Sequence, residues 1–282
     1  MLNARMLKLR INIEGLIENT SYRPCHMQSS QFEIAMLVKK ENKTCGPKSG
    51  HLSLFDSSLE EFNMLNMFIL FLVIASASAI SWPNGRYSLP KPIDGCPLGW
   101  ETGCRYQDNE DNNNINSVYP NRGYHFFGTF KRNTLMCYCI KTTDSGNGSW
   151  PSGNYCIARK GGSCPAGFCT GHIYWDDEDN ANTNSKSGIL PDGVYDRNTK
   201  TYYCCRSDGS AYRDINLPTS KPFYLYQYTS NCQHVRGMDR YEESITMDDE
   251  DDKNNSSDDG CHPIKTDTTE VHYCYYSLSS SK

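Results

Sequence analysis

The chain has 282 residues, a formal net charge of −5 at neutral pH and 14 cysteines. Its length accommodates one or two domains. The negative charge, and the lack of a basic patch with interleaved aromatic residues, argue against nucleic acid as a partner. Because cytosolic proteins seldom keep so many thiols, the cysteines predict disulfide bonds and an oxidising compartment. Their irregular spacing does not match a zinc module, which would use two close Cys-x-x-Cys pairs.

A hydrophobic run, Met64–Ala79, follows a first stretch of weak periodicity. The run is too short to span a bilayer, which takes about 20 residues. It ends in the small-residue sequence ASASA, a pattern that signal peptidase accepts. We therefore predict a secretory signal peptide over residues 64–79 and a mature chain of residues 80–282. Because a signal peptide begins a protein, residues 1–63 are predicted to be an unstructured prefix from an over-extended reading frame; the alternative is an unusual internal anchor.

The predicted mature chain contains related segments that divide it into three pseudo-repeats of about 65 residues. WPNGRY at residues 82–87 is echoed by WPSGNY at residues 150–155. CPLGW at residues 96–100 is echoed by CPAGF at residues 164–168. Each copy closes on a cysteine-containing strand, and the third copy, which begins near Lys221, is the most divergent.

Short aromatic and β-branched runs lie between clusters of Gly, Pro, Asn and Asp, and no segment keeps a 3.6-residue apolar period. This pattern predicts short strands and little helix. One such unit cannot bury its apolar face alone, whereas three units closed around a pseudo-threefold axis can, and closure removes exposed sheet edges. We predict a single all-β domain over residues 80–282, either a β-prism or a β-trefoil.

The repeat also predicts part of the disulfide pattern. Each copy has one cysteine near its start and one in its closing strand, which predicts the intra-repeat pairs Cys96–Cys139, Cys164–Cys204 and Cys232–Cys274. A disulfide that closes such a loop of about 40 residues contributes about 3–4 kcal/mol. The remaining six are expected to link different repeats: Cys104, Cys137, Cys156, Cys169, Cys205 and Cys261.

Three acidic segments recur along the chain: Tyr106–Asn116 (YQDNEDNNNIN), Tyr174–Asn184 (YWDDEDNANTN) and Met247–Ser257 (MDDEDDKNNSS). In each, oxygen-bearing side chains stand at alternate positions, and a curled backbone would direct them at a calcium ion, although the spacing is not that of an EF-hand. The candidate calcium ligands are Asp108, Glu110, Asp176, Glu178, Asp248 and Glu250. The alternative is structural: Asp and Asn side chains bond their own backbone in turns, and each repeat needs the same turn.

Two sets of side chains are candidates for ligand binding. The run Phe223–Tyr228 alternates as a strand, which places three tyrosine rings on one face that would either stack on sugars or belong to a half-buried sheet. The second set, from the second acidic segment, would bond hydroxyls and amides. The candidates are Tyr224, Tyr226 and Tyr228, with Asp176, Glu178 and Asn180.

The sequence contains no nucleophile elbow, zinc-protease motif or phosphate loop, so we expect no enzymatic activity. A glycosidase with two carboxylates, Asp176 and Glu178, is the conceivable exception. Glycosylation sequons at Asn147, Asn254 and Asn255 match a secreted glycoprotein.

An ordered set of motifs over residues 81–276 resembles the apextrin C-terminal domain, ApeC. The motifs are WPxGxY, GCPxGW, WDDEDxxNxN, LPDGVY, RNTKTYYCCRSDG, INLPTSKPFYLY, CQxVxGM and YCYY. The layout is also similar to the β-prism of vitelline membrane outer layer proteins, which favours the prism over the trefoil. The ApeC resemblance implies a secreted, extracellular invertebrate protein that recognises bacterial peptidoglycan in innate defence, or else a structural matrix or adhesion protein. Its expected partners are extracellular glycans or matrix proteins, with no cofactor other than calcium and no transmembrane segment.

Overall fold

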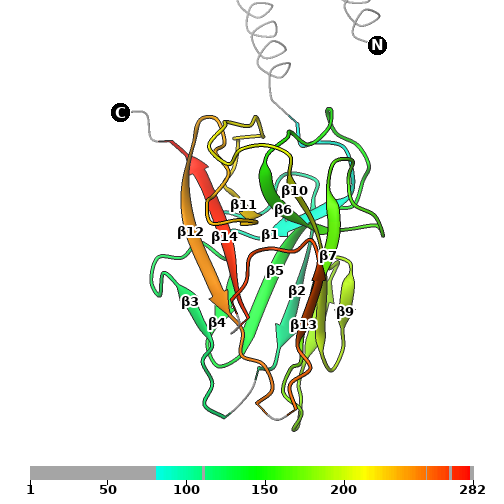
Figure 1. The fold of residues 1–282 in the computed structure, drawn as a ribbon, viewed down its shortest axis with the longest axis vertical. Coiled ribbons are helices and arrows are strands. Elements are labelled where there is room, and N and C mark those ends of the chain that lie inside the picture. The colour runs from blue at the N-terminus through cyan, green and yellow to red at the C-terminus, as the bar shows by residue number, and fades with distance from the viewer. Residues whose placement is uncertain (1–80, 110–111, 252, 267–268, 280–282) are drawn as a thin grey trace, which may run out of the picture. The chain divides into compact units, whose positions relative to one another are not determined.

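Strands and connecting loops make up the part of the chain that the computed structural model describes, residues 81–109, 112–251, 253–266 and 269–279 (Figure 1). These residues form 14 strands and no helix, and the strands join in one hydrogen-bonded antiparallel sheet. The prediction of an all-β fold with short strands is confirmed. The predictions for residues 1–63, for the signal peptide over 64–79 and for Glu110 lie outside the described residues.

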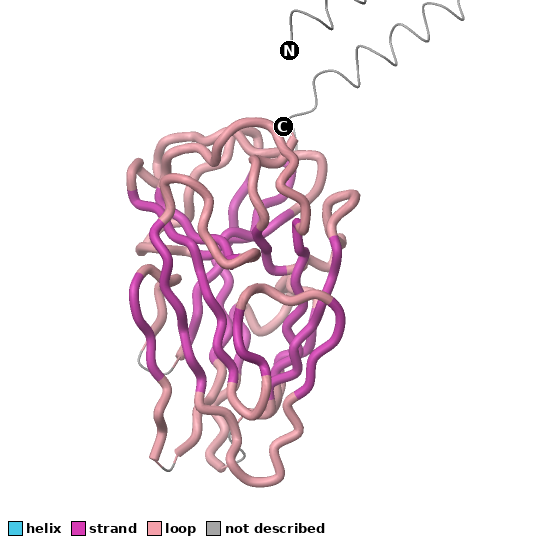
Figure 2. Tube along the Cα trace, turned by 90° about the vertical axis from the view of Figure 1, so that its right-hand side faces the viewer, coloured by secondary structure: helices cyan, strands magenta, loops and turns pink. Residues whose placement is uncertain are grey.

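The strands follow one another as three successive groups. The first is β1 (Tyr87–Pro90), β2 (Glu101–Gln107), β3 (Ser117–Tyr119), β4 (Gly128–Phe130) and β5 (Thr134–Lys141). The second is β6 (Asn154–Arg159), β7 (Cys169–Trp175), β8 (Ser185–Gly188), β9 (Gly193–Tyr195) and β10 (Thr199–Ser207). The third is β11 (Phe223–Tyr226), β12 (Met238–Thr246), β13 (Ser257–Gly260) and β14 (Glu270–Leu278). Figure 2 shows the strands with loops gathered at both ends.

The strands β5, β10 and β14 have strands on both sides. β5 lies between β2 on one side and β1 and β4 on the other; β10 lies between β7 on one side and β6 and β9 on the other. β14 lies between β12 and β11. The first strands of the three groups connect the groups to one another, because β6 of the second group pairs with β1 of the first and with β11 of the third.

Each acidic segment leads into a strand that pairs with a strand of another group. After the first segment the chain enters β3, which pairs with β12; after the second it enters β8, which pairs with β2. After the third it enters β13, which pairs with β7. Each group therefore passes one strand to another group, and the three exchanges form a closed cycle. The three segments lie together at the lower end of Figure 1.

Two clusters of buried side chains form the core. One contains Tyr138, Tyr203 and Tyr273, each of which directly precedes a closing cysteine and is at most 2% exposed. The other contains Tyr87 and Trp150 together with the inward residues of β6, β11 and β14. Because aromatic rings bury the largest areas of all side chains, this composition supplies much of the hydrophobic stabilisation.

Six disulfide bonds crosslink the sheet. The pairs Cys96–Cys139, Cys164–Cys204 and Cys232–Cys274 are those predicted from the repeat, with Cα–Cα distances of 5.4, 5.5 and 5.6 Å. For four of the other six cysteines, the expectation of links between repeats is wrong. Cys104–Cys137 and Cys156–Cys205 join residues directly opposite each other on β2–β5 and β6–β10, within one group of strands. Strand register therefore placed these partners together.

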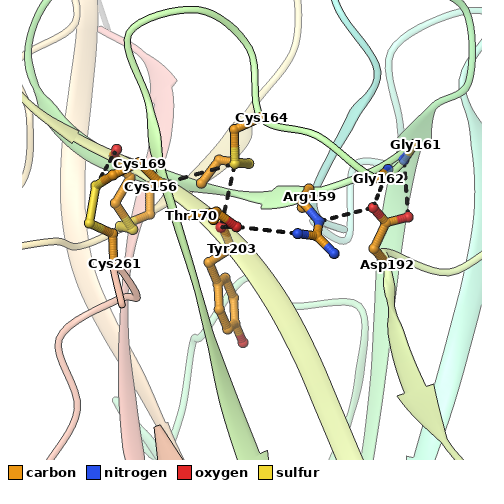
Figure 3. The surroundings of a disulfide bond; sticks show 12 residues. Cys156, Arg159, Gly161, Gly162, Cys164, Cys169, Thr170, Asp192, Tyr203 and Cys261 are labelled. Atoms are coloured by element: carbon orange, nitrogen blue, oxygen red, sulfur yellow. Dashed lines mark hydrogen bonds and ion pairs between the residues drawn. A yellow bond between two sulfur atoms is a disulfide. The ribbon is translucent and has the colours of Figure 1, made fainter. Parts of the chain in front are cut away.

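The remaining disulfide, Cys169–Cys261, joins the start of β7 to the residue after β13 (Figure 3). It links residues 92 positions apart in the sequence and fixes the exchanged strand β13 to β7. At the turn that follows β6, Asp192 accepts hydrogen bonds from the Gly161 and Gly162 N–H groups and from Arg159 Nε (Figure 3). Both glycines have φ near +85 to +89°, a conformation that favours glycine, so the carboxylate holds a turn that other residues rarely form.

Candidate functional site

The acidic segments bond to one another in a ring. The Asp108 N–H donates to Asn184 Oδ1 at 2.6 Å, the Asp176 N–H to Ser256 Oγ at 2.8 Å, and the Asp248 N–H to Asn116 Oδ1 at 2.5 Å. Each segment thus receives a bond from one of the other two and gives a bond to the third. The cycle is the same as the cycle of exchanged strands.

The side chains of the same three aspartates also accept hydrogen bonds from the backbone of another segment. Asp108 Oδ2 accepts from the Thr183 N–H at 2.8 Å and the Thr183 hydroxyl at 2.7 Å. Asp176 Oδ2 accepts from the Asn255 N–H at 2.9 Å, and Asp248 Oδ2 accepts from the Ile115 N–H at 3.0 Å. These carboxylates, predicted as metal or ligand contacts, therefore hold the fold together at the crossing.

The backbone of the three segments has the same unusual conformation at the same position. Asn113, Ala181 and Lys253 have φ values of 47°, 53° and 61°. A left-handed conformation is uncommon for residues other than glycine, asparagine and aspartate, so Ala181 and Lys253 adopt it at a cost in free energy. The hydrogen bonds across the ring offset that cost.

The glutamates of the second and third segments are buried as well. Glu178 is 3% exposed and its Oε1 accepts from the Asn180 N–H; Glu250 is 6% exposed and its Oε2 accepts from the Asp179 N–H. Of the three ligand candidates in the second acidic segment, Asp176 and Glu178 are buried and Asn180 is exposed. Within the described residues, no group of three or more His, Cys, Asp and Glu side chains is placed to hold a metal ion. Calcium binding stays a prediction.

One buried acid inside the ring was not among the sequence candidates. Asp177 accepts hydrogen bonds from Gln107 Nε2 at 2.6 Å, Thr199 Oγ1 at 2.6 Å and Asn184 Nδ2 at 2.7 Å. Burial raises the pKa of Asp177 to about 7, while these donors and the positive charge of Arg105 act in the opposite direction. No sequence pattern singles out Asp177, because strand alternation does not tell which of two adjacent aspartates faces the interior.

The tyrosine face predicted on β11 is turned into the protein. Tyr224 and Tyr226 are 0% and 1% exposed, and the Tyr224 ring stacks on Phe126 at 4.4 Å between centroids. The Tyr224 hydroxyl donates to Glu243. Because both faces of β11 are covered, the prediction that Tyr224 and Tyr226 contact a ligand is wrong; Tyr228 is half-buried against the same core.

A pocket at the start of the domain offers aromatic surface instead. Its volume is about 380 Å³, within the range of ligand pockets. Its lining residues include Trp82, Leu98, Trp100, Lys141, Ser220 and Lys221. The two indole rings are half-buried, with centroids 5.2 Å apart and planes tilted by 57°. Leu98 is fully exposed at the rim.

The surrounding backbone positions Trp82 firmly. The Asn147 N–H donates to the Trp82 carbonyl at 3.1 Å, and the Asn84 N–H donates to the Gly148 carbonyl at 2.9 Å. The Tyr87 hydroxyl donates to the Pro83 carbonyl at 3.0 Å, which closes the WPxGxY motif. These bonds fix the motif against the loop that contains Asn147, so the pocket wall is formed before any ligand arrives.

Trp100 is held by a turn and by ring contacts. Its N–H donates to the Pro97 carbonyl at 3.2 Å, in a turn where Gly99 has φ of 81°. Its ring lies edge-on to Tyr87 at 5.5 Å. Neither this indole N–H nor that of Trp82 donates to any described residue, and neither is among the buried unpaired polar atoms. Both indole N–H groups are therefore unpaired and not fully buried.

Sequence reasoning used Trp82 and Trp100 only as markers of the repeat. The second copy shows why the pattern alone was insufficient: Trp150, the counterpart of Trp82, is 3% exposed and packs on Phe168 at 5.8 Å. The tryptophan of the motif is thus almost fully buried in one copy, at the edge of a hollow of about 200 Å³, and half-buried in the pocket of about 380 Å³ in the other.

Within the described residues, none of the secondary structure is a helix that could cross a membrane. A six-disulfide, all-β domain with an open aromatic pocket has the features of an extracellular protein. The chain belongs to the ApeC family: the family model for the C-terminal domain of apextrin matches residues 82–276. No curated protein and no solved structure matches the chain.

Proposed function

We propose that this protein is a secreted, non-catalytic binding protein that recognises bacterial cell-wall glycan, namely peptidoglycan, in innate defence. The observation that carries the proposal is the pair Trp82 and Trp100, two half-buried rings 5.2 Å apart with free N–H groups in a pocket of about 380 Å³. Membership of the ApeC family and the six disulfides support an extracellular setting for this binding.

The pocket suits a sugar for physical reasons. The apolar face of a pyranose ring packs on an indole ring, and the indole N–H donates to a hydroxyl or an amide oxygen at the ring edge. The existing contacts already hold both tryptophans, so little side-chain entropy is lost on binding. A weak single site gains avidity on a repetitive polymer when several protein copies engage it.

We also propose that the domain consists of three related units in a prism-like arrangement. Three observations support this. The backbone has a positive φ at the matching residues Asn113, Ala181 and Lys253. The acidic segments form a closed ring of hydrogen bonds, and three disulfides lie at matching positions. In this arrangement the exchanged strands β3, β8 and β13 lock each unit to another.

A structural matrix or adhesion protein is the second candidate. Six disulfides and a closed cycle of exchanged strands favour durability outside the cell, which a matrix component needs. A protein of this kind would bind other matrix components and would not discriminate among bacterial polymers.

Cosedimentation separates the two candidates. The secreted protein is mixed with insoluble peptidoglycan, chitin or cellulose, and the bound fraction is measured for wild type, Trp100→Ala and the control Tyr212→Ala, whose ring is 66% exposed elsewhere. We expect wild type and the control to bind peptidoglycan and Trp100→Ala to lose at least tenfold in affinity. Equal binding of all three proteins would contradict the assigned pocket. Release of soluble fragments would indicate an enzyme.

A further inference from the structure

The charges that line the Trp82–Trp100 pocket have one sign. The lining contains two lysines, Lys141 and Lys221, and no aspartate or glutamate, although the chain as a whole has a net charge of −5. Two acids are next in sequence to lining residues: Glu101 follows Trp100, and Asp144, which acts electrostatically on Lys141, precedes Ser145 and lines two other hollows. Pockets lined by one sign of charge concentrate ligands of the opposite sign.

The two lysines differ in burial and in how many of their ammonium N–H groups are already hydrogen-bonded. Lys141 is 5% exposed, and its ammonium group donates to the carbonyl oxygens of Gly85, Thr143 and Ser145. All three of its N–H bonds are therefore used, and it forms no ion pair within the described residues. It lines the pocket and contributes a positive charge there, but its three N–H groups already donate to carbonyl oxygens and are not available to a ligand.

Lys221 is exposed at the other side of the pocket. Its Nζ donates to the Cys96 carbonyl at 3.3 Å, which uses one N–H and leaves two. That bond holds the ammonium near the CPLGW turn, next to Trp100. An ammonium with two unused donors, beside an aromatic surface, is suited to a carboxylate on a sugar.

We infer that this pocket selects an acidic saccharide: the sugar ring packs on Trp82 and Trp100, and its carboxylate accepts hydrogen bonds from Lys221. The inference rests on the proposed function, because it concerns the same pocket. Acidic saccharides have two sources outside a cell, the bacterial wall polymer and the acidic polysaccharides of an extracellular matrix. The chemistry of recognition is the same for both.

The test uses matched ligands that differ only in charge. Soluble peptidoglycan glycan fragments from which the stem peptide has been removed, so that the lactyl carboxylate of each muramic acid is free, are compared with the same fragments after these carboxylates have been amidated, and hyaluronan is compared with its amidated form. Titration calorimetry measures the affinity of wild type, Lys221→Gln and the control Lys186→Gln, which changes an exposed lysine on β8. A charge-assisted hydrogen bond corresponds to about tenfold in affinity or more.

We expect wild type and Lys186→Gln to bind an acidic form at least tenfold more tightly than its amidated form, and Lys221→Gln to bind both forms alike. Equal affinity of wild type for the two forms of peptidoglycan fragment would overturn the inference and leave the proposed function standing. Acid-dependent binding of hyaluronan without any binding of peptidoglycan would support the inference and overturn the bacterial source. Binding to neither polymer would overturn both.

A second pair of variants avoids any loss of packing. Leu98 is fully exposed at the rim, so Leu98→Glu and Leu98→Gln change the pocket entrance without disturbing the core. If the ligand is acidic, Leu98→Glu weakens binding of the acidic form at least several-fold more than Leu98→Gln does, and the difference shrinks in 0.5 M salt because of screening. An identical effect of the two substitutions would contradict the inference.

Discussion

Replacing Asp176 by alanine tests whether the ring of acidic segments holds the fold together. Asp176 Oδ2 accepts from the Asn255 N–H at 2.9 Å, and Oδ1 accepts from Asn198 Nδ2 at 2.8 Å. Asp176→Ala removes both acceptors and leaves donors unpaired at a residue that is 6% exposed. Leaving a buried donor unpaired costs about 1–3 kcal/mol, so we expect a loss of about 3 kcal/mol in the free energy of unfolding.

In a domain of this size such a loss lowers the melting temperature by about 6–12 °C. The matched control is Asp179→Ala in the same segment, where the carboxylate is half-exposed and pairs with Arg197. A surface ion pair of this kind contributes about 0–1 kcal/mol. Thermal unfolding with the disulfides intact measures both variants, and equal melting temperatures for the two would refute the structural role of the ring.

The same experiment addresses calcium. If the segments are purely structural, Asp176→Ala loses the same stability in EDTA as in millimolar calcium, and wild type melts at the same temperature in both. A rise in the wild-type melting temperature with calcium that the variant lacks would support a calcium site formed by the predicted ligands instead.

Three further outcomes are expected. Because the folded-state pKa of Asp177 is raised to about 7 from 3.8, this group contributes stability below pH 4 that is lost as the pH rises to 7. The melting temperature of Asp177→Asn should therefore rise progressively above that of wild type between pH 5 and 8. Parallel plots of melting temperature against pH for the two proteins would contradict this. Asn147, Asn254 and Asn255 are all exposed, but the Nδ2 atom of Asn255, which would carry a glycan, donates to Asp176 Oδ2 and the Lys253 carbonyl, so glycosidase treatment should shift the mobility of Asn255→Gln as much as that of wild type, and a smaller shift for the variant would contradict this. Mass spectrometry of the secreted protein should give an N-terminus at Ile80; a larger product retaining residues 1–63 would disprove the predicted signal cleavage.

Three of the six disulfides and the strand content were predictable because they follow from local chemistry. Cysteines at matching positions in copies of one unit meet the same surroundings, so Cys96, Cys164 and Cys232 find equivalent partners. Gly, Pro, Asn and Asp between short aromatic runs leave only strands and turns as options. These features depend on residues within one unit.

What the sequence could not provide depends on contacts between units. Alternation predicted that Tyr224 and Tyr226 share a face, but it could not tell that β14 and β6 flank β11 and that core residues cover both of its faces. The same limit applies to the exchange of β3, β8 and β13, since nothing in these four-residue or shorter strands specifies a partner. Trp82 and Trp100 became a candidate site only when the fold placed Lys221 beside them.

The most direct test of the central claim uses the four tryptophans of the chain. In a sample labelled with nitrogen-15 at tryptophan, each indole N–H gives its own NMR signal. Trp82 and Trp100 lie in the pocket, whereas Trp150 and Trp175 are 3% and 0% exposed in the core. On titration with soluble peptidoglycan fragments, the account predicts that the Trp82 and Trp100 signals shift with one common binding curve while the other two stay in place. Shifts confined to Trp150 and Trp175, or no shift at saturating fragment, would contradict it.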